Sequence, residues 1–198
     1  MASPTLIIFA KPPRMGLAKT RLAKGLGRSE ARRIARFTLA RAMQAARSSG
    51  LKTRLYVEPA IATADTLGGL WPASIPRFAQ APGDLGDRLK QAMIEAPHGP
   101  VIFIGADAPG IRSRHLRQAG LALRHKGAVF GPANDGGFWL FGLSQQLRRP
   151  DIFDEVRWST PHAMEDVWSD LPADSRVTLL AQLTDIDVAE DWKTYKKQ

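Results

Sequence analysis

Acidic side chains at two places in this chain have the type and setting that divalent-metal chemistry requires. Asp107 lies in Gly-Ala-Asp-Ala-Pro, directly after the apolar run 100–105. A carboxylate at the end of a buried strand, turned by a proline, can hold a hard cation that bridges phosphate oxygens. Asp185 and Asp187 form a second acidic pair, of which only one is expected to join Asp107. Capping of a turn or helix is the alternative role for these carboxylates.

A cation-rich loop follows the first apolar run, 5–10. Residues 11–22 read Lys-Pro-Pro-Arg-Met-Gly-Leu-Ala-Lys-Thr-Arg-Leu, and four cations lie within eleven positions: Lys11, Arg14, Lys19 and Arg21. A loop beyond the carboxyl end of a strand can present cations and backbone N–H groups to phosphate, and Gly16 lets a ligand approach the backbone closely. The P-loop pattern is excluded because Ala18 stands where that pattern requires a glycine. A basic surface loop without a ligand is the alternative.

A third acidic residue, Asp135, lies between two apolar runs in Pro-Ala-Asn-Asp-Gly-Gly-Phe-Trp. Hairpin turns favour the same Asn-Asp-Gly-Gly sequence, so its position alone favours a turn. Cysteine is absent, and metal-ligand spacing is missing from the histidines, which are His98, His115, His125 and His162. Any bound metal is therefore expected to be Mg²⁺ or Mn²⁺ held by oxygen.

The composition fits one domain. The chain has 198 residues, 44% of them hydrophobic, which is enough for a core of ordinary size. The lack of cysteine excludes a disulfide framework and a thiolate nucleophile, and it favours a reducing compartment, so we expect a cytoplasmic protein. No stretch approaches the roughly 20 apolar residues of a spanning helix, and no basic segment precedes the first apolar run, so no membrane span is expected.

The net charge of +9 is concentrated at the N-terminal end. Residues 1–54 contain 13 Lys and Arg side chains and a single acid, Glu30, whereas the remainder contains 15 basic and 18 acidic side chains. A segment of this kind suits a polyanion, which could be nucleic acid, an acidic membrane surface or the phosphates of a nucleotide. A solvated, charged helix face is the alternative.

Apolar runs of strand length alternate with stretches of helical period, which predicts an α/β layered domain. Strands are expected at 5–10, 53–57, 75–79, 100–105, 128–131, 138–143 and 176–180. Helices are expected at 30–48, 62–70, 85–95, 113–125, 161–170 and from 188 onward. Ser29 and Ser113 are the expected N-caps of two of these helices, and Gly50 is expected to end the first.

Five motifs in a fixed order carry a resemblance to a known family. The first, K-x-P-x-x-G-x-x-K-T-R-L, is matched by Lys11, Pro13, Gly16, Lys19, Thr20, Arg21 and Leu22. The second, Q-x-x-G-D-L-G-x-R-[LM], is matched by Gln80, Gly83, Asp84, Leu85, Gly86, Arg88 and Leu89. The others are G-x-D-x-P at 105–109, P-A-x-D-G-G-[YF]-x-L-x-G-L at 132–143 and V-x-W-S-T at 156–160. The sequence thus resembles a bacterial family of GT-A-like transferases of undefined substrate, related to 2-phospho-lactate guanylyltransferase and more distantly to molybdenum cofactor guanylyltransferase.

The resemblance implies a GT-A, or nucleotide-diphospho-sugar transferase, fold. This is a Rossmann-like three-layer sandwich with a mostly parallel central sheet, in which residues 1–110 bind the nucleotide and residues 111–198 bind the acceptor. Where sugar transferases of this fold usually carry D-x-D, this chain has a lone Asp107.

The same resemblance assigns roles to individual residues. Nucleotide and phosphate binding fall to Lys11, Gly16, Lys19, Thr20, Arg21, Gly86 and Arg88. Asp107, completed by Asp187 in preference to Asp185, would hold Mg²⁺ or Mn²⁺. Asp135 would bind or deprotonate the acceptor hydroxyl, which makes it a catalytic candidate together with Asp107 and Lys19. The acceptor pocket would be lined by Asp135, Gly136, Gly137, Trp158 and Ser159.

The leading interpretation is a metal-dependent glycosyltransferase that uses a nucleoside diphosphate sugar and an unknown small-molecule acceptor. The alternative is a nucleotidyltransferase that releases pyrophosphate from a nucleoside triphosphate, which the four loop cations favour. In both reactions negative charge builds up on a departing phosphate group, and cations placed there lower the barrier. A noncatalytic nucleic-acid-binding protein explains least, because an Arg-rich helix accounts for none of the later motifs.

Overall fold

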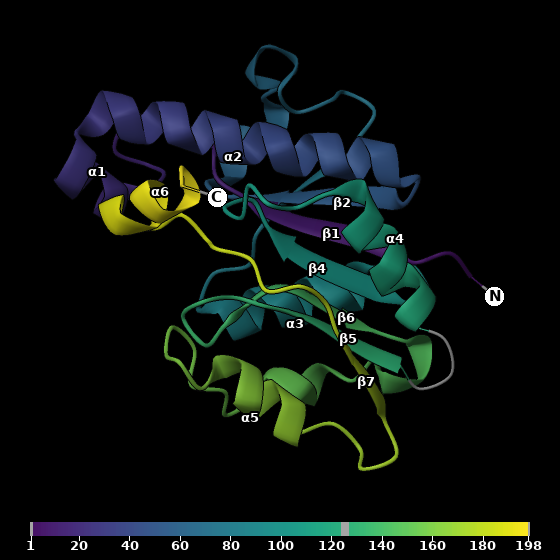
Figure 1. Cartoon of the computed structure of the whole chain (residues 1–198). Helices are drawn as coiled ribbons and strands as arrows, with labels where there is room; N and C mark the ends of the chain where they lie inside the picture. Colours follow the sequence, from purple (N-terminus) through teal and green to yellow (C-terminus); the bar gives the residue numbers. More distant parts are fainter. Residues whose placement is uncertain (1, 124–126, 198) are drawn as a thin grey trace.

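The computed structural model describes residues 2–123 and 127–197, and in this part of the chain a seven-stranded sheet lies between two helical layers (Figure 1). The strands are β1 (Thr5–Ala10), β2 (Lys52–Val57), β3 (Arg77–Ala79), β4 (Val101–Gly105), β5 (Gly127–Pro132), β6 (Phe138–Leu143) and β7 (Arg176–Leu179). Their order across the sheet is β3-β2-β1-β4-β6-β5-β7, and β6 runs antiparallel to both of its neighbours. The other neighbouring pairs are parallel. The predicted three-layer α/β sandwich with a mostly parallel sheet is confirmed.

The helices divide between the two faces of the sheet and one of its ends. One face is covered by α2 (Arg28–Ser49) and α4 (Ser113–Ala122), and the other by α3 (Leu85–Glu95) and α5 (Ala163–Ser169). The short helices α1 (Thr20–Leu26) and α6 (Ala189–Tyr195) pack together beside the start of α2 (Figure 1). Short 3₁₀ turns are η1 (Ala60–Ala64), η2 (Leu67–Gly69), η3 (Gln145–Leu147) and η4 (Pro150–Phe153). Among the described residues, no helix combines the length and apolarity needed to cross a bilayer.

The central strands are apolar at consecutive positions because both of their faces are covered. Side chains alternate between the faces of a strand. In β1, Leu6 and Ile8 join the core under α2 and α4, whereas Ile7 and Phe9 join the core under α3 and α5. β4 behaves in the same way. This explains why a strand of this sheet reads as an unbroken apolar run in the sequence.

The first predicted helix differs from the structure at its start. Ser29 is not its cap, because α2 begins at Arg28 after Gly27, whose φ of 82° separates α2 from α1. Residues 20–22, which begin α1, were expected to be loop, but Leu22 is buried with Ile34, Ile186 and Trp192, and this contact stabilises an additional helix. The predicted end at Gly50 is confirmed by its left-handed backbone.

Two further helix predictions were wrong in part. The helix expected at 62–70 is replaced by η1 and η2, because Gly68 and Gly69 take positive φ values of 65° and 85° that interrupt a helix. Ser113 is the first residue of α4, and the extended residue Arg112 occupies the cap position. The predicted extension of this helix to His125 reaches residues outside the described part of the chain.

Buried Trp139 on β6 holds the segment after β7 against the sheet. Its indole Nε1 donates a hydrogen bond to the Ala181 carbonyl at 3.1 Å. Leu183 then donates its backbone N–H to the Pro132 carbonyl at 3.1 Å, and Ile186 donates to the Asp107 carbonyl at 3.1 Å. These bonds place the Asp-Ile-Asp segment next to the loop that carries Asp107.

We therefore predict that Trp139→Phe loosens this segment. Phenylalanine leaves the Ala181 carbonyl without its donor, which should lower the free energy of unfolding by about 1–3 kcal/mol. Urea unfolding measures the loss. Trp168→Phe is the matched control, since Trp168 is 39% exposed and donates no hydrogen bond to a described residue. Equal losses in the two variants would contradict the role assigned to the Trp139 indole.

Candidate functional site

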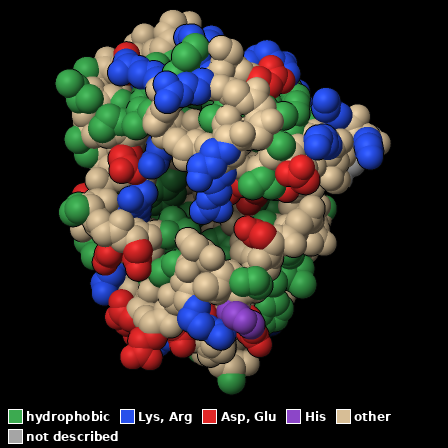
Figure 2. Space-filling model, turned by 90° about the vertical axis from the view of Figure 1, so that its left-hand side faces the viewer, with side chains coloured by type: hydrophobic (Ala, Val, Ile, Leu, Met, Phe, Trp, Pro, Cys, Tyr) green, Lys and Arg blue, Asp and Glu red, His purple; other side chains and the backbone are tan. Residues whose placement is uncertain are grey.

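The carboxyl ends of β1, β2, β3 and β4 meet at one edge of the sheet, because these neighbouring strands are parallel. Figure 2 views the molecule toward this edge, whose surface is hollowed near its middle and carries both basic and acidic side chains. In an open α/β sheet, ligands bind in the crevice outside these strand ends.

Lys19 connects two of the five motifs with the C-terminal Asp-Ile-Asp segment through ion pairs. Its Nζ lies 2.7 Å from Asp187 Oδ1 and 3.4 Å from Asp107 Oδ2. The Lys19 side chain is only 12% exposed. Burial by itself lowers the pKa of the Lys19 ammonium, but the charges of Asp107 and Asp187 outweigh burial and raise it above its ordinary value. The cationic loop, the G-x-D-x-P motif and the C-terminal Asp-Ile-Asp segment therefore form one charged centre.

The Lys19 backbone adopts a conformation that non-glycine residues rarely take. Its φ and ψ are 55° and 46°, in the left-handed region, at the position directly before α1. Such a conformation costs on the order of 1–3 kcal/mol and persists only when the surroundings impose it. Here the buried Leu22 fixes α1 from one side, and the two carboxylates fix the ammonium from the other. The loop is thus held in the form that presents Lys19 to the aspartates.

Asp185 also acts on this centre. Its Oδ1 is buried and has no hydrogen-bond partner in the part of the chain that the structure describes. Burial raises the pKa of the Asp185 carboxyl well above its ordinary value, Asp107 raises it further, and Lys19 opposes both. Both aspartates therefore face the Asp107 region, and the prediction that only one can do so was wrong, because side chains two positions apart in an extended segment share a face while Ile186 between them points into the core. The cap of α6 is supplied by Asp191, which accepts from the Asp187 and Val188 N–H groups.

The donor set fits a hard divalent cation that is shared with a phosphate ligand. Asp107, Asp185 and Asp187 offer only oxygen, which Mg²⁺ and Mn²⁺ prefer. Among residues 2–123 and 127–197, no three His, Asp or Glu side chains are arranged as a ready-made metal site. Mg²⁺ is usually held by one or two carboxylates together with substrate phosphates, so a ready-made cage is not required. The unpartnered Asp185 oxygen is a further ligand atom of the right type.

A second polar cluster lies at the ends of β1, β2 and β3. Glu58 Oε2 lies 3.1 Å from Lys11 Nζ and 3.1 Å from Arg88 Nη1. Arg88 also donates to Gln80 Oε1 at 3.3 Å, and the Gln80 amide donates to the Tyr56 carbonyl at 3.0 Å. The structure thereby brings the predicted residues Lys11 and Arg88 together. Sequence reasoning missed Glu58, although its place directly after β2, matching that of Lys11 after β1, was a usable signal.

Gly86 joins the second motif to the fifth. Asp84 caps α3 by accepting from the Asp87 N–H at 3.0 Å, which puts Gly86 in the first turn. A Cβ atom on Gly86 would lie 2.6 Å from Trp158 Nε1 and 3.0 Å from the Phe153 carbonyl oxygen. Only glycine therefore lets Trp158 approach the helix this closely.

Asp135 occupies the turn between β5 and β6. Its Oδ1 accepts from the Gly137 N–H at 3.0 Å, which is the turn role that its position favours. Gly136 has a φ of 85°, and a Cβ there would lie 2.2 Å from the Pro161 carbonyl oxygen, so this turn packs on the residues that follow Ser159. The Asp135 charge also raises the pKa of Asp185. The turn is therefore close enough to the charged centre to act on it.

Other predicted phosphate-binding residues lie at the edge of this site. Gly16 has a φ of 78° in the exposed loop, as expected of a backbone that needs glycine. Thr20 and Arg21 are exposed at the start of α1, and within the described residues Arg21 forms no ion pair. Arg14 is paired with Asp65. The structure thus clusters Lys19, Asp107 and Asp187 and leaves Arg21 free in solvent.

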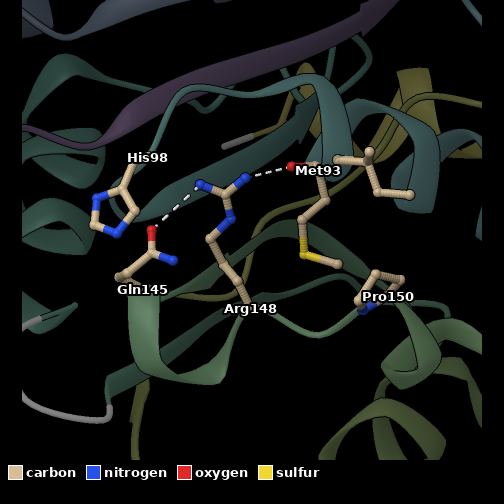
Figure 3. Close-up of a pocket in the computed structure, with 6 residues that line it drawn as sticks. Met93, His98, Gln145, Arg148 and Pro150 are labelled. Carbon is tan, nitrogen blue, oxygen red and sulfur yellow. Dashed lines mark hydrogen bonds between the residues drawn. The ribbon is translucent and has the colours of Figure 1, made fainter.

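A cavity of about 240 Å³ lies at the opposite edge of the sheet, next to the start of β4 (Figure 3). Its lining residues are Met93, Ile94, His98, Gln145, Arg148 and Pro150. The Arg148 guanidinium donates to the carbonyls of Pro97 at 2.6 Å and Gly99 at 2.8 Å, and also to those of Met93 and Ala96. These carbonyls belong to the end of α3 and the loop after it, so Arg148 acts as a structural cap there and the cavity is not part of the candidate site.

Comparison with known proteins supports a transferase-like fold. A family model described as "Uncharacterized protein conserved in bacteria (DUF2064)" matches residues 38–160. A protein from Desulfovibrio desulfuricans G20, provisionally described as a nucleotide-diphospho-sugar transferase, is 27% identical, with a TM-score of 0.87 over 98% of this chain and 87% of that one. No curated protein matches the sequence.

Two more distant structures share the fold alone. Rv0371c from Mycobacterium tuberculosis H37Rv, solved in complex with manganese, is 13% identical with a TM-score of 0.58 over the full length of both chains. The 4-diphosphocytidyl-2C-methyl-D-erythritol synthase of Anaerococcus prevotii DSM 20548 is 11% identical with a TM-score of 0.65 over 99% of this chain and 96% of that one. The fold is therefore that of nucleotide-diphospho-sugar transferases, as the sequence resemblance implied, and similar structures include nucleotidyltransferases.

We predict that Asp185→Asn stabilises the protein at neutral pH when divalent metal is chelated. The folded state holds the Asp185 proton more tightly than the unfolded chain, so wild-type stability falls as the pH rises from about 3.8 through the raised pKa. Asparagine removes this ionisation, and each unit of pKa difference corresponds to about 1.4 kcal/mol. Urea unfolding should show a gain near pH 7 that shrinks near pH 4. Exposed Asp151→Asn is the control, and a gain that does not change with pH would contradict the assignment.

We predict that Gly86→Ala displaces Trp158. The added methyl group should cost about 1–3 kcal/mol in the free energy of unfolding, because it meets both an indole ring and a backbone carbonyl. Trp158→Phe removes the indole nitrogen, so the double variant should recover part of the loss. Thermal unfolding of the two single variants and the double variant provides the measurement, and strictly additive losses would show that the two residues do not meet.

Proposed function

Since the chain belongs to the bacterial family DUF2064, and its fold is that of nucleotide-diphospho-sugar transferases, we propose that it is a metal-dependent transferase with a nucleotide-activated donor. The donor that we assign is a nucleoside diphosphate sugar, and the acceptor is a small molecule with a hydroxyl group. One observation carries this proposal: Lys19 from the cationic loop contacts both Asp107 and Asp187. This contact brings an ammonium group, which suits a phosphate, next to carboxylates, which suit a divalent metal.

The donor phosphates bind between the loop and the aspartates. Asp107 and Asp187 hold Mg²⁺ or Mn²⁺, with Asp185 as a further ligand or a neighbour that tunes the site. The metal, when bound, stabilises the negative charge of the departing phosphate oxygen. Lys19 lies between the same carboxylates, so it exchanges part of its contact with them for the donor phosphate. Lys11, Gly16, Thr20 and Arg21 complete the phosphate site.

The nucleoside occupies the crevice at the ends of β1, β2 and β3. Glu58 fixes the directions of Lys11 and Arg88 there, and Gly86 keeps the start of α3 close to Trp158. Residues 1–110 thus form the donor half of the site. Residues 111–198 form the acceptor half, although Asp187 returns from that half to the donor metal.

In the transfer step, the acceptor oxygen forms a bond to the anomeric carbon of the sugar. The bond between that carbon and the phosphate oxygen breaks, and its electron pair leaves with the nucleoside diphosphate. Asp135 accepts the proton of the acceptor hydroxyl, and its place in the turn beside Asp185 brings a base close to the metal centre. Gly136, Gly137, Trp158 and Ser159 shape the acceptor pocket.

A second candidate reaction is nucleotidyl transfer from a nucleoside triphosphate. The cations of the first loop favour it, because exposed Arg21 adds positive charge beside Lys19 that a third phosphate could use. The 27% identity with the Desulfovibrio protein over nearly the whole chain favours the sugar nucleotide. The two reactions release different products, nucleoside diphosphate or pyrophosphate, which provides a direct test.

The test incubates the protein with Mn²⁺ and panels of nucleoside diphosphate sugars and triphosphates, and measures nucleoside diphosphate and pyrophosphate separately. Release of nucleoside diphosphate supports glycosyl transfer. Pyrophosphate without nucleoside diphosphate would assign nucleotidyl transfer instead. Thermal shift measurements with each donor, with and without Mn²⁺, identify donors even when the acceptor is missing, because a ligand of the folded state raises its apparent stability.

We predict that Asp107→Asn lowers turnover about 10²- to 10³-fold, because it removes one group that stabilises charge in the transition state. The variant should also lose the part of the donor thermal shift that depends on Mn²⁺. Asp151→Asn removes an exposed carboxylate in η4 and should leave both readouts unchanged. A metal-dependent shift that survives in Asp107→Asn would contradict the metal site.

A further inference from the structure

The outer layer formed by α1, α2 and α4 is strongly basic. These three helices contain ten Lys and Arg side chains and one acid, Glu30. The helices on the other face differ, because α3 contains two basic and two acidic side chains and α5 contains two acids and no cation. The fold adds α4, from the second half of the chain, to the basic N-terminal helices. The positive charge is therefore a property of one face of the molecule.

Most of these cations form no ion pair with another residue in the described part of the chain. We call the exposed arginines of this layer the basic face: Arg28, Arg32, Arg36 and Arg47 on α2, and Arg114 and Arg117 on α4. None of the six forms an ion pair with another described residue, and Arg117 alone donates a hydrogen bond, to the Ser48 carbonyl at 3.0 Å. Arg28, Arg32 and Arg36 follow each other at four-residue spacing, and like charges at that spacing destabilise a helix. The phosphate site does not use them.

The same side of the sheet carries the two most exposed large apolar side chains among the described residues. Ile61 in η1 is 80% exposed and Leu121 in α4 is 62% exposed. Leu121 follows Arg114 and Arg117 by seven and four residues, so the three share one side of α4. Ala62, next to Ile61, packs in the core under α2. Leu121 thus lies on a helix of the basic layer, and Ile61 lies on a turn that covers the same side of the sheet.

The shape of this layer is broad. α2 has 22 residues and is about 33 Å long, and α4 packs beside it (Figure 1). In the view of Figure 2, Lys and Arg side chains gather in the upper part of the molecule, where α2 lies, and Asp and Glu gather at the lower left. α2 lies along the sheet and is flanked by α4 and α6, so it does not stand clear of the body. A helix that reads a nucleic acid must enter a groove about 12 Å wide.

We propose that the basic face binds an anionic lipid surface, with Ile61 and Leu121 reaching into the headgroup region. Exposed arginines that form no ion pair with a described residue, exposed apolar side chains on the same side of the sheet and a broad, outward surface are the features of an interfacial protein. The candidate active site lies at the sheet edge and uses none of the six arginines of the basic face. This inference does not depend on the proposed transferase reaction.

The experiment measures binding of the purified full-length protein to vesicles by sedimentation. Vesicles of phosphatidylcholine alone are compared with vesicles in which about a third of the lipid is phosphatidylglycerol. Binding is expected to the anionic vesicles only, and it should be lost in about 0.5 M NaCl, which screens surface charges beyond a few ångströms. Ile61→Gln with Leu121→Gln should weaken binding without changing its dependence on salt.

Charge-reversal variants test which face is used. Arg36→Glu should weaken vesicle binding about 25-fold, because each basic charge near the surface changes the affinity about fivefold. Arg36→Lys keeps the charge and should bind almost as the wild type does. Arg176→Glu is the matched control, since Arg176 is an exposed residue on β7, away from α2, and its reversal changes the net charge by the same amount. Circular dichroism confirms that each variant is folded.

The proposal is overturned if the folded protein does not bind anionic vesicles at low salt, or if Arg176→Glu and Arg36→Glu weaken binding equally. Binding to duplex DNA without binding to vesicles would assign the basic face to nucleic acid, which also overturns it. Nucleoside diphosphate release from a soluble donor is measured separately, so the outcome for the transferase reaction remains distinct.

Discussion

The ion pairs of one lysine with two aspartates are the interaction on which the candidate site depends. Lys19, Asp107 and Asp187 come from segments that are up to 168 residues apart, and none of the three can reach the others unless the whole sheet is formed. Bringing like-charged carboxylates together costs free energy, which the buried ammonium offsets. The left-handed backbone of Lys19 also costs conformational free energy, which the packing of α1 offsets. The site is therefore held in a charged arrangement, which the proposed phosphate ligand would rearrange.

Apolar side chains packed beside these ion pairs hold the three charged residues in position. Ile186 lies between the two C-terminal aspartates in sequence and is fully buried with Leu22, Ile34 and Trp192. One apolar contact thus fixes both ends of the ion pair, because Leu22 positions the helix after Lys19 and Ile186 positions Asp185 and Asp187. This explains why α1 and α6, each only seven residues long, are stable: they pack on each other and on α2.

Charge has two separate distributions in this molecule. At the edge of the sheet, opposite charges are interleaved within hydrogen-bond distance, as in the contacts of Glu58 with Lys11 and Arg88. Over α2 and α4, the six exposed arginines of the basic face form no ion pair with a described residue. The first arrangement suits a small ligand with its own mixed charges, whereas the second suits an extended anion. A net charge of +9 does not distinguish the two, but their geometry does.

The sequence by itself determined the layered α/β architecture and the positions of all seven strands in the described residues. It also identified Lys19, Asp107 and the Asp-Ile-Asp pair as site candidates. Both results were possible because apolar periodicity and motif spacing are local signals. Only the tertiary structure decided that both Asp185 and Asp187 face the centre, that Glu58 joins Lys11 to Arg88 and that Gly86 meets Trp158. It also decided that α1 is a helix and that α4 extends the basic face. These features depend on which buried surfaces pack together, and such contacts between distant segments leave no period or spacing in the chain.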